Sequence, residues 1–248
     1  MIRPRRLLLA ALFFLPLPAA AQLGLETLPR ARVTVSPYFG ARATHDTRVE
    51  LGVNDGSQAF ASLTEERRDG TQLVGGQVEV RVFGPLGVVA ALAHSPASDI
   101  DFVRFDPGLP PDTSFGIGPE LWLGKLGISY RLPEPSRDTR RFRTAGYISV
   151  APAFVREDPR DNVGVQPEFR EPITNFAVNV SGDASISLGT PRLALQLGIE
   201  DYITFWNGEA HARQFERFFE RIGDPADVSA DYDTSHIIVP RIGISLRF

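Results

Sequence analysis

The sequence predicts an all-β protein that folds as a closed antiparallel up-and-down transmembrane β-barrel of about eight strands. Three observations lead to this prediction: a short apolar N-terminal segment with the features of an export signal, apolar residues that alternate with polar ones, and connections of two very different lengths. After the first segment, no stretch stays apolar for the roughly 20 residues that a membrane-spanning helix needs. A membrane-embedded form of this chain therefore has to be a closed barrel, because only that alternative pairs every backbone group in lipid.

Composition and charge exclude several classes of function. The 248 residues include 26 Lys and Arg, 30 Asp and Glu, and no Cys. The acidic excess argues against a nucleic-acid partner, because nucleic-acid-binding proteins carry a basic face. The absence of Cys excludes disulfides, thiolate metal sites and Cys nucleophiles.

Residues 1–21 are predicted to be a cleaved signal peptide, which makes the mature chain an exported protein. Three arginines precede an apolar run from 7 to 17, and small residues end the segment at Ala21. This order is that of secretory signal peptides, and a run of about 11 residues is too short for the alternative, a membrane anchor. We expect residues 22–31 to form a short N-terminal periplasmic segment and residues 32–248 to form the barrel domain.

The remaining chain is predicted to contain eight strands, because period-two alternation places apolar and polar residues on opposite faces of a strand. In the clearest example, Phe176 and Val178 alternate with Asn179 and Ser181. The predicted strands cover residues 33–41, 74–82, 86–95, 122–132, 142–154, 176–188, 193–205 and 238–248. The third predicted strand, residues 86–95, is apolar on both faces, and we predict it to be a strand because the segments on either side of it are strands. Several reach the ~9–11 residues of a tilted membrane strand.

The connections between these strands differ in length in a regular way. The short ones are residues 84–85, 133–140 and 189–191, and the long ones are residues 44–69, 96–112, 156–171 and 207–234. Short periplasmic turns and long extracellular loops are typical of outer-membrane barrels. An even number of strands places both termini on the short-turn side, as expected for a chain exported into the periplasm.

The last long connection contains a segment with helical rather than strand periodicity. Within residues 209–222, Phe215, Phe218, Phe219 and Ile222 recur at helical spacing among arginines and glutamates. This pattern predicts a short amphipathic helix. Three positions remain open: capping the barrel mouth, lying on the outer leaflet with its arginines near lipopolysaccharide phosphates, or packing on the other loops.

The final strand carries alternating apolar residues and ends in an aromatic residue, with Ile244, Leu246 and Phe248 on one face. From residue 32 to 248, the chain resembles the small eight-stranded outer-membrane β-barrel proteins of the OmpA-like and OmpW-like class. In that class such a strand is the assembly signal recognised by the barrel-assembly machinery. The resemblance implies a location in the outer membrane, contact with lipid and lipopolysaccharide, a monomeric state, and a non-enzymatic role.

Aromatic residues lie near both ends of the predicted strands, where they suit the two membrane interfaces. Those near the short turns are Phe83, Tyr130, Phe142 and Phe248, and those near the long loops are Phe39, Phe154, Phe205 and Trp206. The alternative fold is a soluble sandwich, which has to hide the apolar faces between two sheets.

The opposite face of the strands carries charged residues. A barrel of about eight strands is just wide enough for side chains to fill it, and a buried charge is costly unless it is paired. We therefore predict a network inside the lumen, formed by Glu79, Asp183 and Glu200 with Arg81, Lys125, Arg143 and Arg241. We interpret it as a plug that holds the barrel together, and a gate is the alternative.

Three prolines fall inside predicted strands, although proline normally belongs at sheet edges or bulges. Because a closed barrel has no edge, we expect Pro37, Pro152 and Pro240 at bulges or at the rim.

The four histidines are the candidates for catalysis. His45, His94, His211 and His236 lie at or near predicted outer strand ends or loops, where barrel enzymes keep their sites. A catalytic His needs an orienting carboxylate and a nucleophile within reach, and adjacent strand residues such as His94 and Ser95 point to opposite faces. No local motif matches a barrel enzyme, and no acidic group has the spacing of a calcium loop. We predict no catalytic site, metal or cofactor.

The predicted function is that of a non-enzymatic outer-membrane protein with a plugged lumen, acting in membrane integrity, adhesion or surface interaction. A narrow channel or a small or hydrophobic-solute transporter requires an open or laterally breached lumen. A lipid-modifying barrel enzyme requires a His–carboxylate–hydroxyl cluster at one rim. A soluble secreted barrel with an apolar ligand requires the apolar face to point inward.

Overall fold

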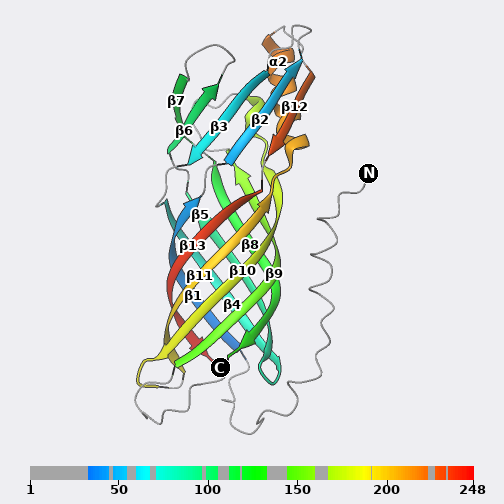
Figure 1. Cartoon of the computed structure of the whole chain (residues 1–248). Coiled ribbons are helices and arrows are strands. Elements are labelled where there is room, and N and C mark those ends of the chain that lie inside the picture. The colour runs from blue at the N-terminus through cyan, green and yellow to red at the C-terminus, as the bar shows by residue number, and fades with distance from the viewer. Residues whose placement is uncertain are drawn as a thin grey trace. The chain divides into compact units, whose positions relative to one another are not determined.

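The structure is a computed structural model that contains a closed eight-stranded barrel and a second, five-stranded sheet (Figure 1). It describes residues 33–44, 47–54, 60–67, 71–96, 99–105, 112–117, 119–132, 144–159, 167–190, 192–222, 227–232 and 234–248. The predicted signal peptide and the segment 22–31 lie outside these residues. None of the helices in the described ranges is long and apolar enough to cross a membrane.

The barrel confirms the predicted fold class. Its strands are β1 (Val33–Thr44), β4 (Thr71–Phe83), β5 (Leu86–Ser95), β8 (Glu120–Arg131), β9 (Thr144–Asp158), β10 (Ile173–Ser187), β11 (Leu193–Phe205) and β13 (Ser235–Arg247). They pair antiparallel in the order β1-β13-β11-β10-β9-β8-β5-β4, and β4 pairs with β1 to close the sheet. Closure leaves no strand edge unpaired, which is what a lipid environment demands of a sheet.

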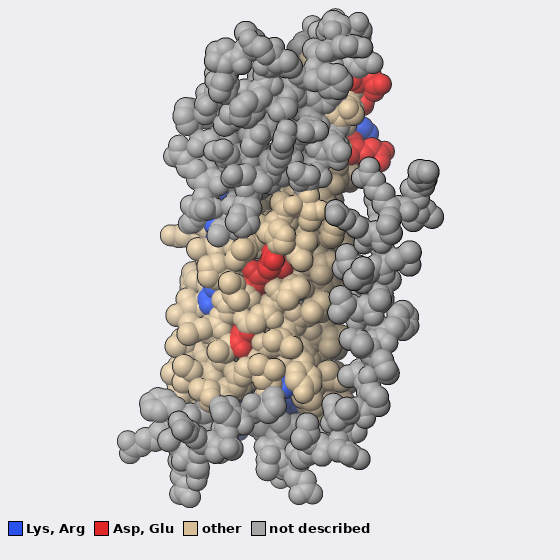
Figure 2. All heavy atoms as spheres, viewed as in Figure 1, with Lys and Arg blue, Asp and Glu red and all other residues tan. Residues whose placement is uncertain are grey.

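The two faces of the barrel wall are divided as the alternation predicts. Large apolar side chains point outward, among them Phe39 (68% exposed), Leu126 (61%) and Ile128 (62%). Figure 2 shows that the visible part of the wall is mostly free of Lys, Arg, Asp and Glu. Charged side chains such as Lys125 and Glu200 point inward and are buried. This arrangement contradicts the soluble sandwich and the secreted ligand barrel, both of which place the apolar face inside.

Short turns join neighbouring strands at one end of the barrel. Gly84 and Pro85 connect β4 to β5, and the turn uses a positive φ of 52° at Gly84. A residue with a side chain adopts this left-handed conformation only at a cost, which explains glycine here. The predicted connection 133–140 lies outside the described residues.

The long connections contain strands that we did not predict. These are β2 (Thr47–Asn54), β3 (Phe60–Arg67), β6 (Asp99–Phe105), β7 (Asp112–Ile117) and β12 (Asp227–Tyr232). They pair in the order β12-β2-β3-β6-β7. All five come from connections at the end of the barrel opposite the short turns, so three separate loops contribute to one sheet.

The prediction that the three prolines lie at bulges or at the rim is wrong. Pro37, Pro152 and Pro240 each sit inside a strand, face outward, and pair in register with one neighbouring strand. On its other side each proline lies at a two-residue gap in the ladder: β1–β13 for Pro37 and Pro240, and β8–β9 for Pro152. Because a residue in an antiparallel strand sends its backbone N–H toward one neighbour only, a missing N–H interrupts one ladder and leaves the other intact.

The predicted helix is present as α2 (Gly208–Ile222), and it packs on a 3-10 turn, η5 (Pro167–Arg170). The Phe169 ring lies 5.0 Å from the Phe215 ring and 5.7 Å from the Phe218 ring, measured between centroids. Arg217 donates two hydrogen bonds of 2.8 and 2.7 Å to the Glu171 carboxylate. Of the three positions considered for the helix, these contacts favour packing on the other loops.

This ion pair gives α2 a pH-dependent contact. Arg217 lowers the pKa of Glu171 from its ordinary value of 4.5, through hydrogen bonds and charge. A depressed carboxyl pKa means that the contact is fully present above the ordinary value and is lost as the pH falls below it. We predict that amide exchange in α2, corrected for intrinsic rates, accelerates below about pH 4.

The matched variants separate this contact from general acid effects. In Arg217→Ala, we expect amide exchange in α2 to be as fast at every pH as it is in the parent protein at low pH. Arg213→Ala, whose ion pair to Glu209 stays within the helix, is expected to keep the pH dependence of the parent. Equal behaviour of the two variants contradicts the assignment.

Candidate functional site in the barrel interior

The interior of the barrel is filled by two kinds of side chain. Toward the long loops lies a buried apolar layer formed by Tyr38, Leu73, Ala93, Leu121, Leu123, Ala153, Val155, Ala177, Tyr202, Ile237 and Val239. Inward positions are mostly polar or charged toward the short turns, and a second set of buried polar residues lies on the long-loop side of the apolar layer: Arg42, Ser95, Glu157, Asn175, Thr204 and Ser235. β5 is apolar on both faces because its inward residues are buried too, Ala93 in the apolar layer and Val89 nearer the short turns, while its other face forms the wall.

At the boundary between the two regions lies a network of four buried charges. The Lys125 Nζ donates to Glu200 Oε1 at 2.8 Å and to Asn179 Oδ1 at 2.9 Å. The Arg241 guanidinium lies 3.1 Å from the same Glu200 oxygen and donates to both Asp183 oxygens at 2.8 and 2.7 Å. Two positive and two negative groups thus neutralise one another inside the lumen.

The burial of these groups makes their pairing essential. The side chains of Lys125 and Glu200 are 0% and 1% exposed, and those of Arg241 and Asp183 are 2% and 5% exposed. Removing one partner of such a pair leaves an uncompensated charge and typically costs about 3–5 kcal/mol. Hydrogen bonds to charged groups add to this stabilisation when every acceptor is occupied.

Two tyrosines and a glutamine complete the network. Tyr202 donates its hydroxyl to the second Glu200 oxygen at 2.8 Å, and Arg241 donates to Gln77 Oε1 at 2.8 Å. The Arg241 guanidinium carbon also lies 4.6 Å from the centroid of the Tyr38 ring, a cation–π distance. We did not predict these three residues, although each occupies an inward position of an alternating strand.

Gly198 allows the Asp183–Arg241 pair to form. In the ladders, Asp183 on β10 pairs with Gly198 on β11, which pairs with Arg241 on β13. A Cβ atom at residue 198 would collide with the Asp183 carboxylate and lie 3.0 Å from Arg241 Nε. The ion pair therefore spans the middle strand over a residue that has no side chain.

The structure separates the predicted network members into groups. Lys125, Asp183, Glu200 and Arg241 come together. Glu79 and Arg81 lie closer to the short turns, where Glu79 accepts a hydrogen bond from Ser129 at 2.8 Å. Arg143 lies outside the described residues.

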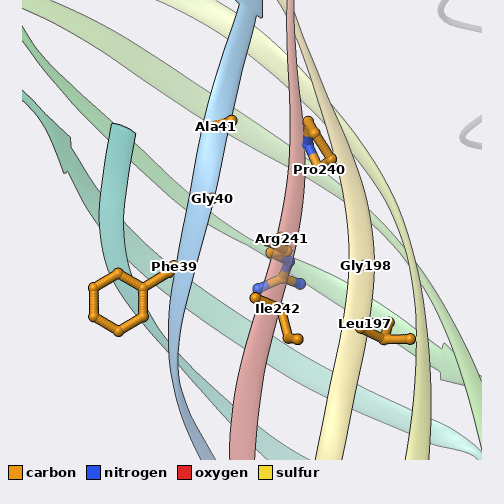
Figure 3. A pocket seen from close by; sticks show the side chains of 8 residues that line it. All are labelled: Phe39, Gly40, Ala41, Leu197, Gly198, Pro240, Arg241 and Ile242. Atoms are coloured by element: carbon orange, nitrogen blue, oxygen red, sulfur yellow. The ribbon is translucent and has the colours of Figure 1, made fainter. Parts of the chain in front are cut away.

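The outer wall has a shallow dent beside this network. It is lined by Phe39, Gly40, Ala41, Leu197, Gly198, Pro240, Arg241 and Ile242, and it coincides with the β1–β13 ladder gap at Pro240. Figure 3 shows Arg241 on β13 between the strands that carry Gly40 and Gly198. Arg241, whose side chain is buried in the network, is the charged residue among those that line the dent.

The predicted assembly-signal residues face outward at the end of β13. Ile244, Leu246 and Phe248 are all exposed, and Phe248 exchanges backbone hydrogen bonds with Val33 at the start of β1. The C-terminal strand is thereby joined to the first strand along the seam that closes the barrel.

Three histidines in the described residues each contact a carboxylate. His94 Nε2 lies 3.1 Å from Glu120 Oε2, and His236 Nδ1 lies 2.9 Å from Asp201 Oδ2. Both pairs are on the outer face of the wall, and neither His has a hydroxyl partner within the described ranges. On α2, His211 Nε2 lies 3.5 Å from Oε2 of the buried Glu157. His45 lies outside the described residues.

No cluster of three His, Asp or Glu side chains suited to a metal ion occurs in the described parts of the chain.

Comparisons with known proteins show the fold. No family model matches the chain, and no curated protein matches it in sequence. Among solved structures, the chain is similar to the outer membrane protein OprG from Pseudomonas aeruginosa, with a TM-score of 0.50 and 13% identity over 88% of this chain and 96% of that one. The outer membrane protease OmpT from Escherichia coli has a TM-score of 0.45 and 9% identity, covering 91% of this chain and all of that one. Neisserial surface protein A has a TM-score of 0.40 and 8% identity, covering 87% and 97%. The chain has the fold of small outer-membrane β-barrel proteins, as its resemblance to them implies.

The interior network predicts that replacing one charged side chain by an uncharged one lowers the stability of the barrel strongly. Glu200→Gln removes the carboxylate shared by Lys125 and Arg241, so we expect the free energy of unfolding to fall by about 3–5 kcal/mol. The measurement is urea unfolding of the refolded protein in detergent or lipid.

A surface variant provides the control. Glu120→Gln removes a carboxylate from a partly exposed pair with His94, and we expect a loss of at most about 1 kcal/mol. A Glu200→Gln effect no larger than that of Glu120→Gln would show that the network does not hold the barrel together.

Proposed function

We propose that this protein is a non-enzymatic integral outer-membrane β-barrel protein, with a plugged lumen and a structural and surface-interaction role. The observation that carries the proposal is the closed interior. The Lys125–Glu200–Arg241–Asp183 network and the apolar layer leave these side chains buried across the lumen. A side-chain-filled barrel of eight strands is a support for loops rather than a conduit.

The outer wall supports the outer-membrane location. Exposed apolar residues face outward from all eight strands, and contact of this large apolar surface with water would be unfavourable. The N-terminal sequence features of an export signal and the likeness to OprG in fold agree with this location. We infer that the wall contacts outer-membrane lipid and lipopolysaccharide, that the barrel-assembly machinery inserts the chain, and that it acts as a monomer.

The long connections support the surface-interaction role. Five strands and α2 are formed from residues between the barrel strands, at the end opposite the short turns. A protein that only spans the bilayer does not need so much ordered structure in its loops. Loops held by a rigid scaffold commonly carry binding residues.

The enzymatic alternative has weaker support. A barrel hydrolase needs a nucleophile beside its His–carboxylate pair, and His94 and His236 have no hydroxyl partner in the described residues. The transporter alternative draws on the dent beside Pro240, but it requires a passage into the lumen past the buried Arg241.

Fractionation followed by bilayer recording tests the proposal. We expect the protein in the outer-membrane fraction, a band that shifts on boiling before electrophoresis, and no stepwise ion conductance in planar bilayers. Recovery as a soluble periplasmic protein contradicts the membrane location. Discrete conductance steps from the heat-shifted protein contradict the plugged lumen and favour the channel.

A further inference from the structure

Three rows of outward-facing residues on β8, β9 and β10 mark a change from an apolar to a polar wall. Gly124, Phe154 and Phe176 pair in one row, the next row toward the long loops is Trp122, Arg156 and Thr174, and the row after that contains Glu120 and Asp158. In outer-membrane barrels, aromatic residues flank the apolar band at each membrane interface. These rows therefore mark the outer edge of the membrane-facing wall.

An open hollow in the wall lies across this change, and we call it the rim hollow. It has a volume of about 590 Å³ and is lined by Trp122, Phe154, Arg156, Asp158 and Thr174. A Cβ atom at residue 124 would collide with the Phe154 ring, so this ring lies over Gly124 on the neighbouring strand. The rim hollow therefore has an aromatic half toward the middle of the wall and a polar half toward the long loops. Its size is within the roughly 300–1,000 Å³ of small-molecule sites.

The polar half offers both hydrogen-bond donors and acceptors. The Arg156 side chain is 40% exposed, and its Nη2 lies 3.8 Å from Asp158 Oδ2, which is an ion-pair distance but too long for a hydrogen bond. Within the described residues this is the one ion pair of Arg156. Its guanidinium donors are therefore accessible beside a carboxylate acceptor, and the hydroxyl of the exposed Thr174 serves as either donor or acceptor.

The charges around the rim hollow do not suit a simple anion. Asp158 and Glu120 lie in the same outward row, and His94 Nε2 lies 3.1 Å from Glu120 Oε2. Glu157, between Arg156 and Asp158 in the sequence, is buried on the inner face. On the outward side of these rows, one guanidinium and one imidazole thus accompany two carboxylates. This mixed set matches a headgroup rich in hydroxyl and amide groups better than it matches a lone phosphate.

We propose that the rim hollow binds the acylated sugar headgroup of a lipopolysaccharide molecule in the outer leaflet. This inference rests on the outer-membrane location proposed above, in which the long-loop end is extracellular. An occupant that crosses from the aromatic half to the polar half must itself be amphipathic, and at the edge of the membrane-facing wall such a molecule is a lipid.

Each half of the rim hollow contacts one part of this lipid. An acyl chain lies against the rings of Trp122 and Phe154. Arg156 donates to carbonyl or phosphate oxygens of the headgroup, because a guanidinium presents several N–H donors in one plane. Asp158 accepts hydrogen bonds from sugar hydroxyl or amide groups. A phospholipid headgroup that lacks the acylated sugar uses only part of this set.

Native mass spectrometry of the purified folded protein in detergent micelles tests this site, with lipid A as the probe and phosphatidylglycerol as the comparison lipid. We expect saturable binding of one lipid A molecule per barrel and at least fivefold weaker binding by Arg156→Gln. A similar loss is expected in Thr174→Phe, which fills the rim hollow from an exposed position. Arg192→Gln is the matched control, because it removes the same charge from an exposed residue beside a short turn, and it is expected to bind like the parent.

Each variant is first checked for its heat-shifted band, so that loss of binding is not loss of the fold. Absence of saturable lipid A binding by the heat-shifted parent protein overturns this inference and leaves the proposed outer-membrane barrel intact, whereas absence of the heat-shifted band contradicts the proposed function itself. Unchanged affinity in folded Arg156→Gln or Thr174→Phe also overturns the site. So does an equal loss in Arg192→Gln, which would indicate general charge attraction, and so does phosphatidylglycerol binding as tight as that of lipid A.

Discussion

The rest of the structure depends on the pairing of buried polar groups within a closed sheet. A wall whose outer face is apolar cannot satisfy its backbone groups outside, so each strand must pair on both sides, and β1 must meet β13 and β4. The same constraint applies to inward side chains. The four charges of the central network neutralise one another, and Tyr202 and Asn179 occupy further hydrogen-bonding positions, while Arg241 Nε and Nη1 remain without a hydrogen-bond partner.

This constraint explains several residues that otherwise look out of place. Gly198 is needed where the Asp183–Arg241 pair spans β11. The prolines are accommodated because each interrupts only one of the two ladders of its strand. The gap at Pro240 lies beside the buried network, because Arg241 belongs to that network and also lines the dent.

Much of the barrel could be predicted from the sequence, because a period of two directly encodes the two faces of a strand. The inward position of Lys125, Asp183, Glu200 and Arg241 followed from that period. Which of them meet did not, since contact depends on the stagger between strands. That stagger places Asp183 level with Arg241 and leaves Glu79 closer to the short turns. The second sheet was missed although Val49, Leu51 and Val53 alternate with polar residues. Its pairing of β2 with β12, far away in the chain, has no local signal.

Spin-label accessibility in lipid bilayers tests the central claim, that the apolar face meets lipid and the polar face is enclosed. The chain contains no Cys, so single cysteines can be introduced at Ile128 and Ser129 on β8, and at Val150 and Ser149 on β9. The account predicts that labels at 128 and 150 are relaxed by oxygen but not by a water-soluble nickel chelate, and that labels at 129 and 149 are shielded from both. Nickel access at 128 and 150, or oxygen access that does not alternate along the strands, would contradict it.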